Sequence, residues 1–450
     1  IKRSFKNMIN IILNILQLDI EKAVELARTR NIQILQNKQV INQYDADYIK
    51  ARSQILPQIS INGIYSYTLN PAVIKFGTPT RYIGYQDPQN PNQFIIYPDP
   101  NSILYFEIPF RPTHSYNAQF TLRQSIFSWF REFNSMKLAE EQIYIQNQNF
   151  ELLQYRISSQ VKSFYIDILF FKETFEIYEK TVKDLEETYN ATRKRYDNGL
   201  ASSLELLQAQ VNYENSKLNY ENAKKTYSDL LSNLKILLNL PEDEEILIID
   251  SLENLKIDTN IQVDENKLKT RKDIVLIQEQ IKSLQRIIQI QNSFNKPNIF
   301  AQVQYLSSKP APNLEDKWGG TWTFSIIFNW NVFDGFSNSS DIQKLNAQIN
   351  QLKLIYDFQI QTSKIQLKNA LNNISLAKRN LEMSSKNSQL AEKLLNSAKI
   401  QFENGLISNL QLYDIQRSYI SSQIAYKQAL RDYYKSLIDL DLILNVGKTQ

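Results

Sequence analysis

The sequence predicts a mainly α-helical protein with a small β part. Tandem-duplicated, long coiled-coil hairpins would form an α-barrel, and four strands per chain would contribute to a trimeric, roughly 12-stranded β-barrel. Three observations support this fold class. The chain repeats itself, long stretches without Gly or Pro carry a seven-residue apolar period, and four separate runs alternate apolar and polar residues.

Composition excludes several classes of function. The 450 residues contain no Cys and a single His, His114, so thiol catalysis, Cys-based metal sites and His-based acid–base sites lack their usual parts. The net charge is only +4 and the charges are interspersed, so no nucleic-acid footprint is predicted. No uninterrupted apolar run is long enough for a transmembrane helix. We predict no catalytic residue, metal or cofactor.

The duplication sets the predicted organisation. Asn198–Ser202 recurs as Asn404–Ser408, 206 residues later, and the match continues to Asn239 and Asn445; Asn31–Pro57 matches Arg271–Pro297. Each half contains a helix, a strand, a loop, a strand, a very long helix, a Gly turn and a long helix. The predicted parts are a first repeat at 18–239, a linker at 240–270, a second repeat at 271–445 and a tail at 446–450.

The N-terminal segment, residues 1–17, allows two interpretations. Lys2, Arg3 and Lys6 precede an apolar run from Met8 to Leu18 that Asn and Gln interrupt. A basic flank before a short apolar run is typical of the end of a secretory signal. The alternative is an amphipathic lead-in to the first helix.

The long helices are predicted from their period and from missing breakers. Residues 135–198 contain neither Gly nor Pro, and as one helix they would measure roughly 90 Å. Gly199 and Gly405 follow the two longest helices, where Gly supplies the left-handed conformation of a helix end. Ser202 and Ser408 can then cap the next helix. Each half should therefore contain an antiparallel helical hairpin with its tip at the Gly.

The four alternating runs lie at about 57–69, 115–127, 297–306 and 321–333. Each has about 10 residues with aromatics toward its ends, as in membrane-spanning strands. Four strands cannot close a barrel, since the smallest have about 8, and an open edge is not tolerated in lipid. A trimer would supply about 12 strands. The loop Asn70–Ser115, which holds 8 of the 13 prolines, and the loop Ser307–Gly320 are expected to form exposed caps.

These features resemble the TolC family of outer-membrane efflux proteins. The resemblance covers about residues 18 to 447 and rests on Leu18–Ala27, Leu56–Ser60, Arg271–Ile274 and the two Gly turns. It implies a homotrimeric channel-tunnel in the cell outer membrane that extends into the periplasm. A belt would form from residues 240–270 and the terminal segments. Lys272 departs from the family, which commonly has Pro there.

The resemblance also implies function and partners. The chain would be the passive exit duct of a tripartite efflux or type I secretion system, not an enzyme. A periplasmic adaptor (membrane fusion) protein and an inner-membrane pump of the RND, ABC or MFS type would open it, and outer-membrane lipid would surround it. Small-molecule efflux and protein secretion stay open. The alternative function is a soluble coiled-coil structural scaffold, and an enzyme has the least support.

The resemblance assigns residues at the tips. Pore constriction and selectivity would involve Glu205 and Gln411, six positions after each Gly, and Gln208 and Asp414, nine positions after it. Rings of carboxylates in a trimer favour cations and bind blocking multivalent ions. Ile407 replaces the family's basic latch residue, so a salt-bridged lock is not expected.

The tip gate would involve Tyr196 and Phe402, each three residues before the turn Gly. Eight residues would face the adaptor: Gly199, Leu200, Ala201, Ser202, Gly405, Leu406, Ile407 and Ser408. An alternative role is open for Glu205 and Asp414, which can also be first-turn charges favoured by the helix dipole.

Overall fold

The computed structural model describes residues 15–109, 112–255, 265–313 and 315–444. The chain forms two compact units. Residues 1–46, 140–285 and 345–450 belong to the helical unit, and residues 47–139 and 286–344 belong to the sheet unit. Most of the predicted N-terminal segment, the tail and residues 256–264 of the predicted linker lie outside the described residues.

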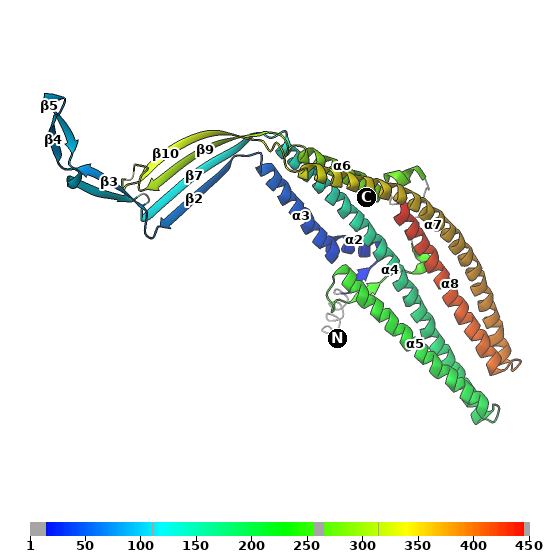
Figure 1. The fold of residues 1–450 in the computed structure, drawn as a ribbon. Helices are drawn as coiled ribbons and strands as arrows, with labels where there is room; N and C mark the ends of the chain where they lie inside the picture. The colour runs from blue at the N-terminus through cyan, green and yellow to red at the C-terminus, as the bar shows by residue number, and fades with distance from the viewer. Residues whose placement is uncertain (1–14, 110–111, 256–264, 314, 445–450) are drawn as a thin grey trace, which may run out of the picture. The chain divides into compact units, whose positions relative to one another are not determined.

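Two helical hairpins form the main part of the helical unit (Figure 1). The helices are α4 (Arg131–Asp197), α5 (Ser203–Leu238), α7 (Ser337–Glu403) and α8 (Asn409–Leu444), and α5 and α8 run back beside α4 and α7. The two longer helices have 67 residues each and the two shorter ones have 36. A helix of that greater length measures about 100 Å. The predicted combination of long helices with a small β part is confirmed.

Shorter elements complete the helical unit. Strand β1 (Leu16–Leu18) pairs in parallel with β8 (Ile246–Ile248), so the N-terminal segment and the linker meet. The remaining elements are α2 (Ile20–Arg30), α3 (Ile32–Ser53), η2 (Leu252–Asn254), η3 (Glu265–Thr270) and α6 (Lys272–Gln291), and α3 and α6 continue into the sheet unit.

The largest apolar core joins both hairpins to these short elements. Tyr165, Ile166 and Leu169 of α4 are fully buried and pack in one cluster with residues of α2, α5, α8, β1 and β8. Tyr165 Oη donates to the Leu18 carbonyl at 2.8 Å and lies 3.0 Å from Asp250 Oδ2. Burial raises the pKa of Tyr165, so this hydroxyl remains a protonated donor. The seven-residue period thus places one stripe of α4, α5 and α8 in this core.

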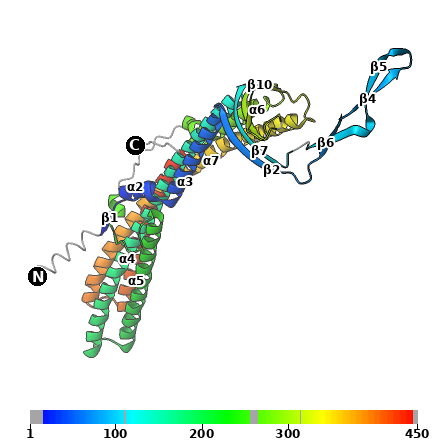
Figure 2. The same cartoon turned by 90° about the vertical axis from the view of Figure 1, so that its left-hand side faces the viewer.

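The sheet unit contains one four-stranded antiparallel sheet (Figures 1 and 2). Its strands are β2 (Gln58–Tyr67), β7 (His114–Phe127), β9 (Asn298–Lys309) and β10 (Gly319–Asn329), in the order β10-β9-β7-β2. Strands from both halves of the duplication therefore meet at the β7–β9 pair. Within the described residues, β2 and β10 each pair on one side only.

The strand registers place side chains of the same chemical kind on the same face of the sheet. Ile61 pairs with Phe120, Phe120 with Tyr305, and Tyr305 with Trp322. On the other face the paired residues are polar: Asn62 with Gln119, Thr121 with Gln304, and Gln304 with Thr323. Directly paired residues of antiparallel strands share a face, so the alternation in the sequence becomes one apolar and one polar face.

The segment expected as a Pro-rich loop contains four strands instead. These are β3 (Val73–Pro79), β4 (Tyr82–Asp87), β5 (Asn90–Pro98) and β6 (Ile103–Pro109), with the short η1 (Pro100–Ser102) before β6. β3 pairs with β6 and β4 pairs with β5. Most of the prolines lie at the ends of strands or in η1. A two-stranded ladder tolerates Pro at positions whose backbone N–H would not bond to the partner strand. The N–H that Pro lacks is then not needed for pairing.

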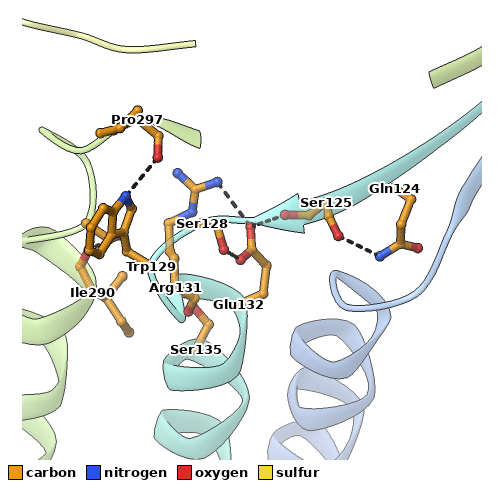
Figure 3. Close-up of polar contacts among 10 residues, drawn as sticks. Gln124, Ser125, Ser128, Trp129, Arg131, Glu132, Ser135, Ile290 and Pro297 are labelled. Carbon is orange, nitrogen blue, oxygen red and sulfur yellow. Dashed lines mark hydrogen bonds and ion pairs between the residues drawn. The ribbon is translucent and has the colours of Figure 1, made fainter. Parts of the chain in front are cut away.

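The sheet passes into α4 through a strained corner (Figure 3). Trp129 and Phe130 adopt φ of +55° and +61°, and the Trp129 indole donates to the Pro297 carbonyl at 2.9 Å. Glu132 accepts from Ser128 and forms an ion pair with Arg131. The second half repeats the corner 206 residues later, where Gly335 and Phe336 have φ of +66° and +68°. The duplication therefore includes this corner as well as the two Gly turns.

Candidate functional site

The two hairpin tips have the same backbone geometry. Gly199 and Gly405 have φ of +72° and +71°. Leu200 N donates to Arg195 O at 2.7 Å and Leu406 N donates to Gln401 O at 2.8 Å, which is the closing bond of a Schellman helix end. No heavy atom lies within 4 Å of where a Cβ would stand on either Gly. The need for Gly is therefore a matter of backbone conformation, not of space.

Each second helix begins with a reciprocal cap. Ser202 Oγ accepts from Glu205 N at 3.2 Å, and Ser202 N donates to Glu205 Oε2 at 2.8 Å. Ser408 and Gln411 form the same two bonds, at 3.3 and 2.9 Å. The predicted Ser caps are confirmed, and residues 205 and 411 are their partners. The Ser202 N–H holds the pKa of the Glu205 carboxyl below its ordinary value.

The tips expose apolar side chains. Leu200 is 71% exposed and Leu406 is 74% exposed, and Leu204, Leu207 and Leu410 in the following turns are exposed as well. Ser202 and Ser408 are exposed, and Ala201 is half-buried. The predicted adaptor-facing residues thus form an apolar and hydroxyl-bearing end on each hairpin.

The two predicted gate residues have different surroundings. Phe402 packs with Ile407 against a buried cluster of Leu395, Ala398 and Leu412. The Arg195 guanidinium of the other hairpin lies over the Phe402 ring, 5.7 Å from its centre. Tyr196 is exposed. Ile407, where we expected no salt-bridged lock, takes part in apolar packing.

A buried polar contact joins the hairpins next to the tips. Asn409 Nδ2 donates to Thr192 Oγ1 at 3.4 Å, and both side chains are buried. A pair of this kind is specific because an unpaired buried amide is costly. The two tips are thereby held together on the α4–α8 side.

The four predicted pore residues form two pairs that do not touch within the chain. Glu205 and Gln208 lie one turn apart on α5, and Gln411 and Asp414 lie one turn apart on α8. Asp414 is exposed and lines a groove of about 840 Å³ between α7 and α8 together with Arg417. In the described part of the chain, its carboxylate has neither a hydrogen bond nor an ion pair. Of the two predicted pore acids, Glu205 therefore caps a helix, whereas Asp414 makes no such contact in the described residues.

Sequence analysis missed an ion-pair cluster that lies between the two hairpins, away from their tips. Lys427 Nζ is 2.8 Å from both Glu173 Oε2 and Glu253 Oε1, and Leu252 N donates to Glu173 Oε1 at 2.7 Å. Burial alone would lower the pKa of Lys427, but its bonds to the two carboxylates outweigh burial and raise it. No local pattern could reveal residues that lie so far apart in the chain.

Other kinds of site find no support among the described residues. No cluster of three His, Asp or Glu side chains could hold a metal ion there. In the same residues, no helix is both long and apolar enough to cross a membrane.

The family follows from a direct comparison. Residues 23–240 and 266–446 match the model of the outer membrane efflux protein family, so the chain belongs to this family. The predicted resemblance and the location in the outer membrane are confirmed. The soluble scaffold considered as an alternative is set aside.

Individual relatives share only about a quarter of their residues with the chain over the matched part. The chain is similar to the probable efflux pump outer membrane protein TtgC of Pseudomonas putida, with 26% identity over 257 residues, which is 56% of this chain and 52% of TtgC. The antibiotic efflux pump outer membrane protein ArpC of Pseudomonas putida matches with the same identity and coverage. The chain thus spans about half the length of the curated relatives it matches.

Solved structures share the fold at low identity. The CmeC outer membrane channel of Campylobacter jejuni matches with a TM-score of 0.73 and 16% identity, over 95% of this chain and 86% of CmeC. The open state of the MtrE outer membrane channel of Neisseria gonorrhoeae matches with a TM-score of 0.73 and 18% identity, over 95% and 89%. A membrane protein from Pseudomonas aeruginosa reaches 0.75 with 17% identity, over 96% and 92%.

Proposed function

We propose that three copies of the chain form a passive exit duct through the outer membrane, as the outer part of a tripartite efflux or type I secretion system. The four-stranded sheets of three copies close into a barrel of about 12 strands. The long helices continue the duct into the periplasm as an α-barrel. The duct performs no chemistry of its own, and the pump supplies the energy and selects the substrate.

The face of the sheet is the observation that carries this proposal. Its apolar side chains are bare, since Ile61 is 76% and Ile326 is 82% exposed. Strands of about 10 residues tilted by about 40° give an apolar band of about 25 Å, which matches the hydrocarbon of an outer membrane. Aromatic pairs lie near the two ends, Tyr65 with Tyr116 and Phe127 with Trp129, as membrane interfaces favour.

The unpaired strand edges support the trimer. A lipid-exposed edge would leave backbone N–H and C=O groups without partners, at several kcal/mol each. If β2 of one copy pairs with β10 of the next, no edge remains. The polar face then lines the lumen, where Gln119 Nε2 donates to Thr121 Oγ1 at 3.0 Å.

The tips serve as the docking and gating end in this proposal. The exposed Leu200 and Leu406 contact the adaptor, and Tyr196 and Phe402 narrow the closed tip. Asp414 and Glu205 of three copies form carboxylate rings that favour cations. Gln208 and Gln411 line the same constriction without charge. TtgC and ArpC are efflux pump outer membrane proteins, which supports a duct that works together with a pump.

Cross-linking across the strand edges tests the duct. The chain has no Cys, so introduced thiols are the only ones present. The double variant Asn62→Cys/Thr323→Cys carries thiols on the polar face of the two edge strands. The matched control Thr121→Cys/Gln304→Cys places them on directly paired residues inside one sheet. A short thiol cross-linker in outer membranes should yield covalent trimers from the edge pair and only monomers from the control.

The detergent-extracted mass provides the second readout. Light scattering should give three times the 52.7 kDa of one chain. A monomeric mass together with no inter-chain product from the edge pair would refute the duct. A trimer that conducts no ions in planar bilayers, even when adaptor and pump are supplied, would refute the conduit while leaving the trimer.

A further inference from the structure

The strands β3–β6 form a two-stranded ribbon of two successive ladders, here called the outer ribbon (residues 73–109). η1 interrupts the ribbon between the β3–β6 and β4–β5 ladders, and two backbone hydrogen bonds bridge this interruption: Thr80 N donates to Ser102 O and Asp99 N donates to Arg81 O, both at 2.9 Å. Figures 1 and 2 both show the ribbon extending from the end of β2 and β7 that lies away from α3.

The two faces of the β3–β6 ladder differ in chemistry. On one face Ile74 pairs with Ile108, Phe76 with Phe106 and Thr78 with Leu104. This face carries no charge, and its five large apolar side chains are between 41% and 51% exposed. The other face carries the ion pair between Lys75 Nζ and Glu107 Oε1, at 2.6 Å. It also carries Val73, and Gly77, over which the Ile103 and Tyr105 side chains pack, so it combines charged and apolar groups.

The ribbon needs a cover for its apolar face. Two-stranded ribbons in water are marginally stable unless a hydrophobic face packs against something. No described residue outside the ribbon covers these side chains, as their exposure shows. A contiguous exposed apolar face of this kind marks an interaction surface.

Length argues against lipid as the cover. The strands β2 and β7 already traverse the bilayer in the proposed duct. Residues 73–87 add one strand length of about 50 Å beyond them, which exceeds the roughly 30 Å of a whole hydrocarbon core. The hydrocarbon core is thus already spanned before the ribbon begins, which favours a protein surface as the cover of the ribbon.

We propose that the apolar faces of the outer ribbons of three copies pack against one another around the trimer axis, outside the membrane. This inference rests on the trimer of the proposed function. β2 and β7 lead into the ribbon in every copy, so three identical ribbons leave a closed trimer at the same height, one third of the circumference apart, around a single axis. Three identical apolar faces around one axis cover one another, while the Lys75 and Glu107 faces stay in water.

Single thiols on the two faces test this packing. Phe76→Cys lies on the apolar face, and the adjacent Lys75→Cys on the charged face is the matched control. With a short bismaleimide in intact outer membranes, Phe76→Cys should give at least five-fold more inter-chain product than Lys75→Cys. Leu104→Cys, on the same face of the partner strand, should behave like Phe76→Cys and replaces it if that variant does not accumulate.

The outcomes separate this inference from the duct itself. If Asn62→Cys/Thr323→Cys forms trimers but the apolar-face thiols cross-link no better than Lys75→Cys, the ribbon packing is wrong and the duct stands. If the apolar-face thiols are protected by lipid and react only after detergent extraction, the membrane is the cover and the inference is overturned. If the edge pair also fails, the duct and the ribbon packing fall together.

Discussion

Glu205 and Gln411 are structural equivalents: each accepts a hydrogen bond from the backbone N–H of the Ser three residues earlier, at 2.8 and 2.9 Å. An acid and an amide therefore perform the same capping task in the two hairpins. Only Glu205 brings a charge to the tip, so the cap and the charge can be separated by substitution.

The cap predicts a local loss of stability. Glu205→Ala removes one half of the capping box and should cost about 1 kcal/mol at the start of α5, which speeds amide exchange in its first turn about five-fold. Glu205→Gln should leave exchange there unchanged, because Gln411 already serves in α8. Hydrogen–deuterium exchange of the detergent trimer measures this. If the first-turn amides of α5 were as protected in Glu205→Ala as in the unmodified chain, the cap would not contribute to stability.

The charge predicts ion selectivity. Glu205→Gln and Asp414→Asn should each weaken cation preference and block by trivalent cations, and the double variant should nearly abolish both. Bilayer recordings provide the measurement. Glu21→Gln, a neutralised exposed acid on α2, is the control and should behave as the unmodified chain. Unchanged selectivity in the double variant would remove both residues from the pore.

The lowered pKa of Glu205 predicts a pH dependence. Its folded pKa lies below the ordinary value of 4.5, so its contribution is complete above that value and is lost as the pH falls through the folded pKa. Below about pH 4.5, the first turn of α5 should open more readily, after correction for intrinsic exchange. The Gln411 cap of α8 is an internal control that should not change, and Glu205→Gln should make α5 equally insensitive.

The tip turn predicts a backbone penalty. Gly405→Val places a β-branched residue at φ +71° and should cost about 1–2 kcal/mol. Gly405→Asn is the matched control, since Asn tolerates this conformation and space is open there. Thermal unfolding and binding of the adaptor should both suffer in the Val variant. A Val variant that melts and docks like the Asn variant would contradict the turn.

The buried ion pair predicts non-additive effects. Lys427→Met leaves Glu173 buried beside an apolar side chain and should destabilise by about 3–5 kcal/mol. Combining it with Glu173→Gln should recover part of that loss, because no unpaired buried charge then remains; Glu253, the other partner of Lys427, is exposed. A double-mutant cycle from denaturant unfolding gives the coupling. Strict additivity would mean that the two side chains do not interact.

Short-range patterns determined most of the fold. The seven-residue period and the absence of Gly and Pro predicted α4 and α7, and alternation predicted runs that correspond to β2, β7, β9 and β10. Gly199 and Gly405 were recognised because a helix reversal needs one residue with positive φ, a conformation that Gly adopts most readily. The Ser caps were recognised because a Ser hydroxyl at a helix start can accept from a backbone N–H of the first turn. The roles of the tip residues in gating and selectivity stay predictions.

Other features escaped sequence analysis because their signals are not local. The outer ribbon was expected as a loop, since eight prolines suggested irregular chain, yet two-stranded ladders accept Pro at their ends. Positive φ at Trp129 and Phe130 could not be predicted because this corner contains no Gly. The equivalent corner in the second half contains Gly335, whose residue type is compatible with positive φ.

What the sequence alone determined is therefore the set of elements, their order and their duplication, because periodicity and turn chemistry act over a few residues. Only the tertiary structure decided that Lys427 meets Glu173, that Asn409 meets Thr192, and that one face of the β3–β6 ladder is free of charge. These relationships depend on strand register and helix packing, where a shift of one residue would exchange every face.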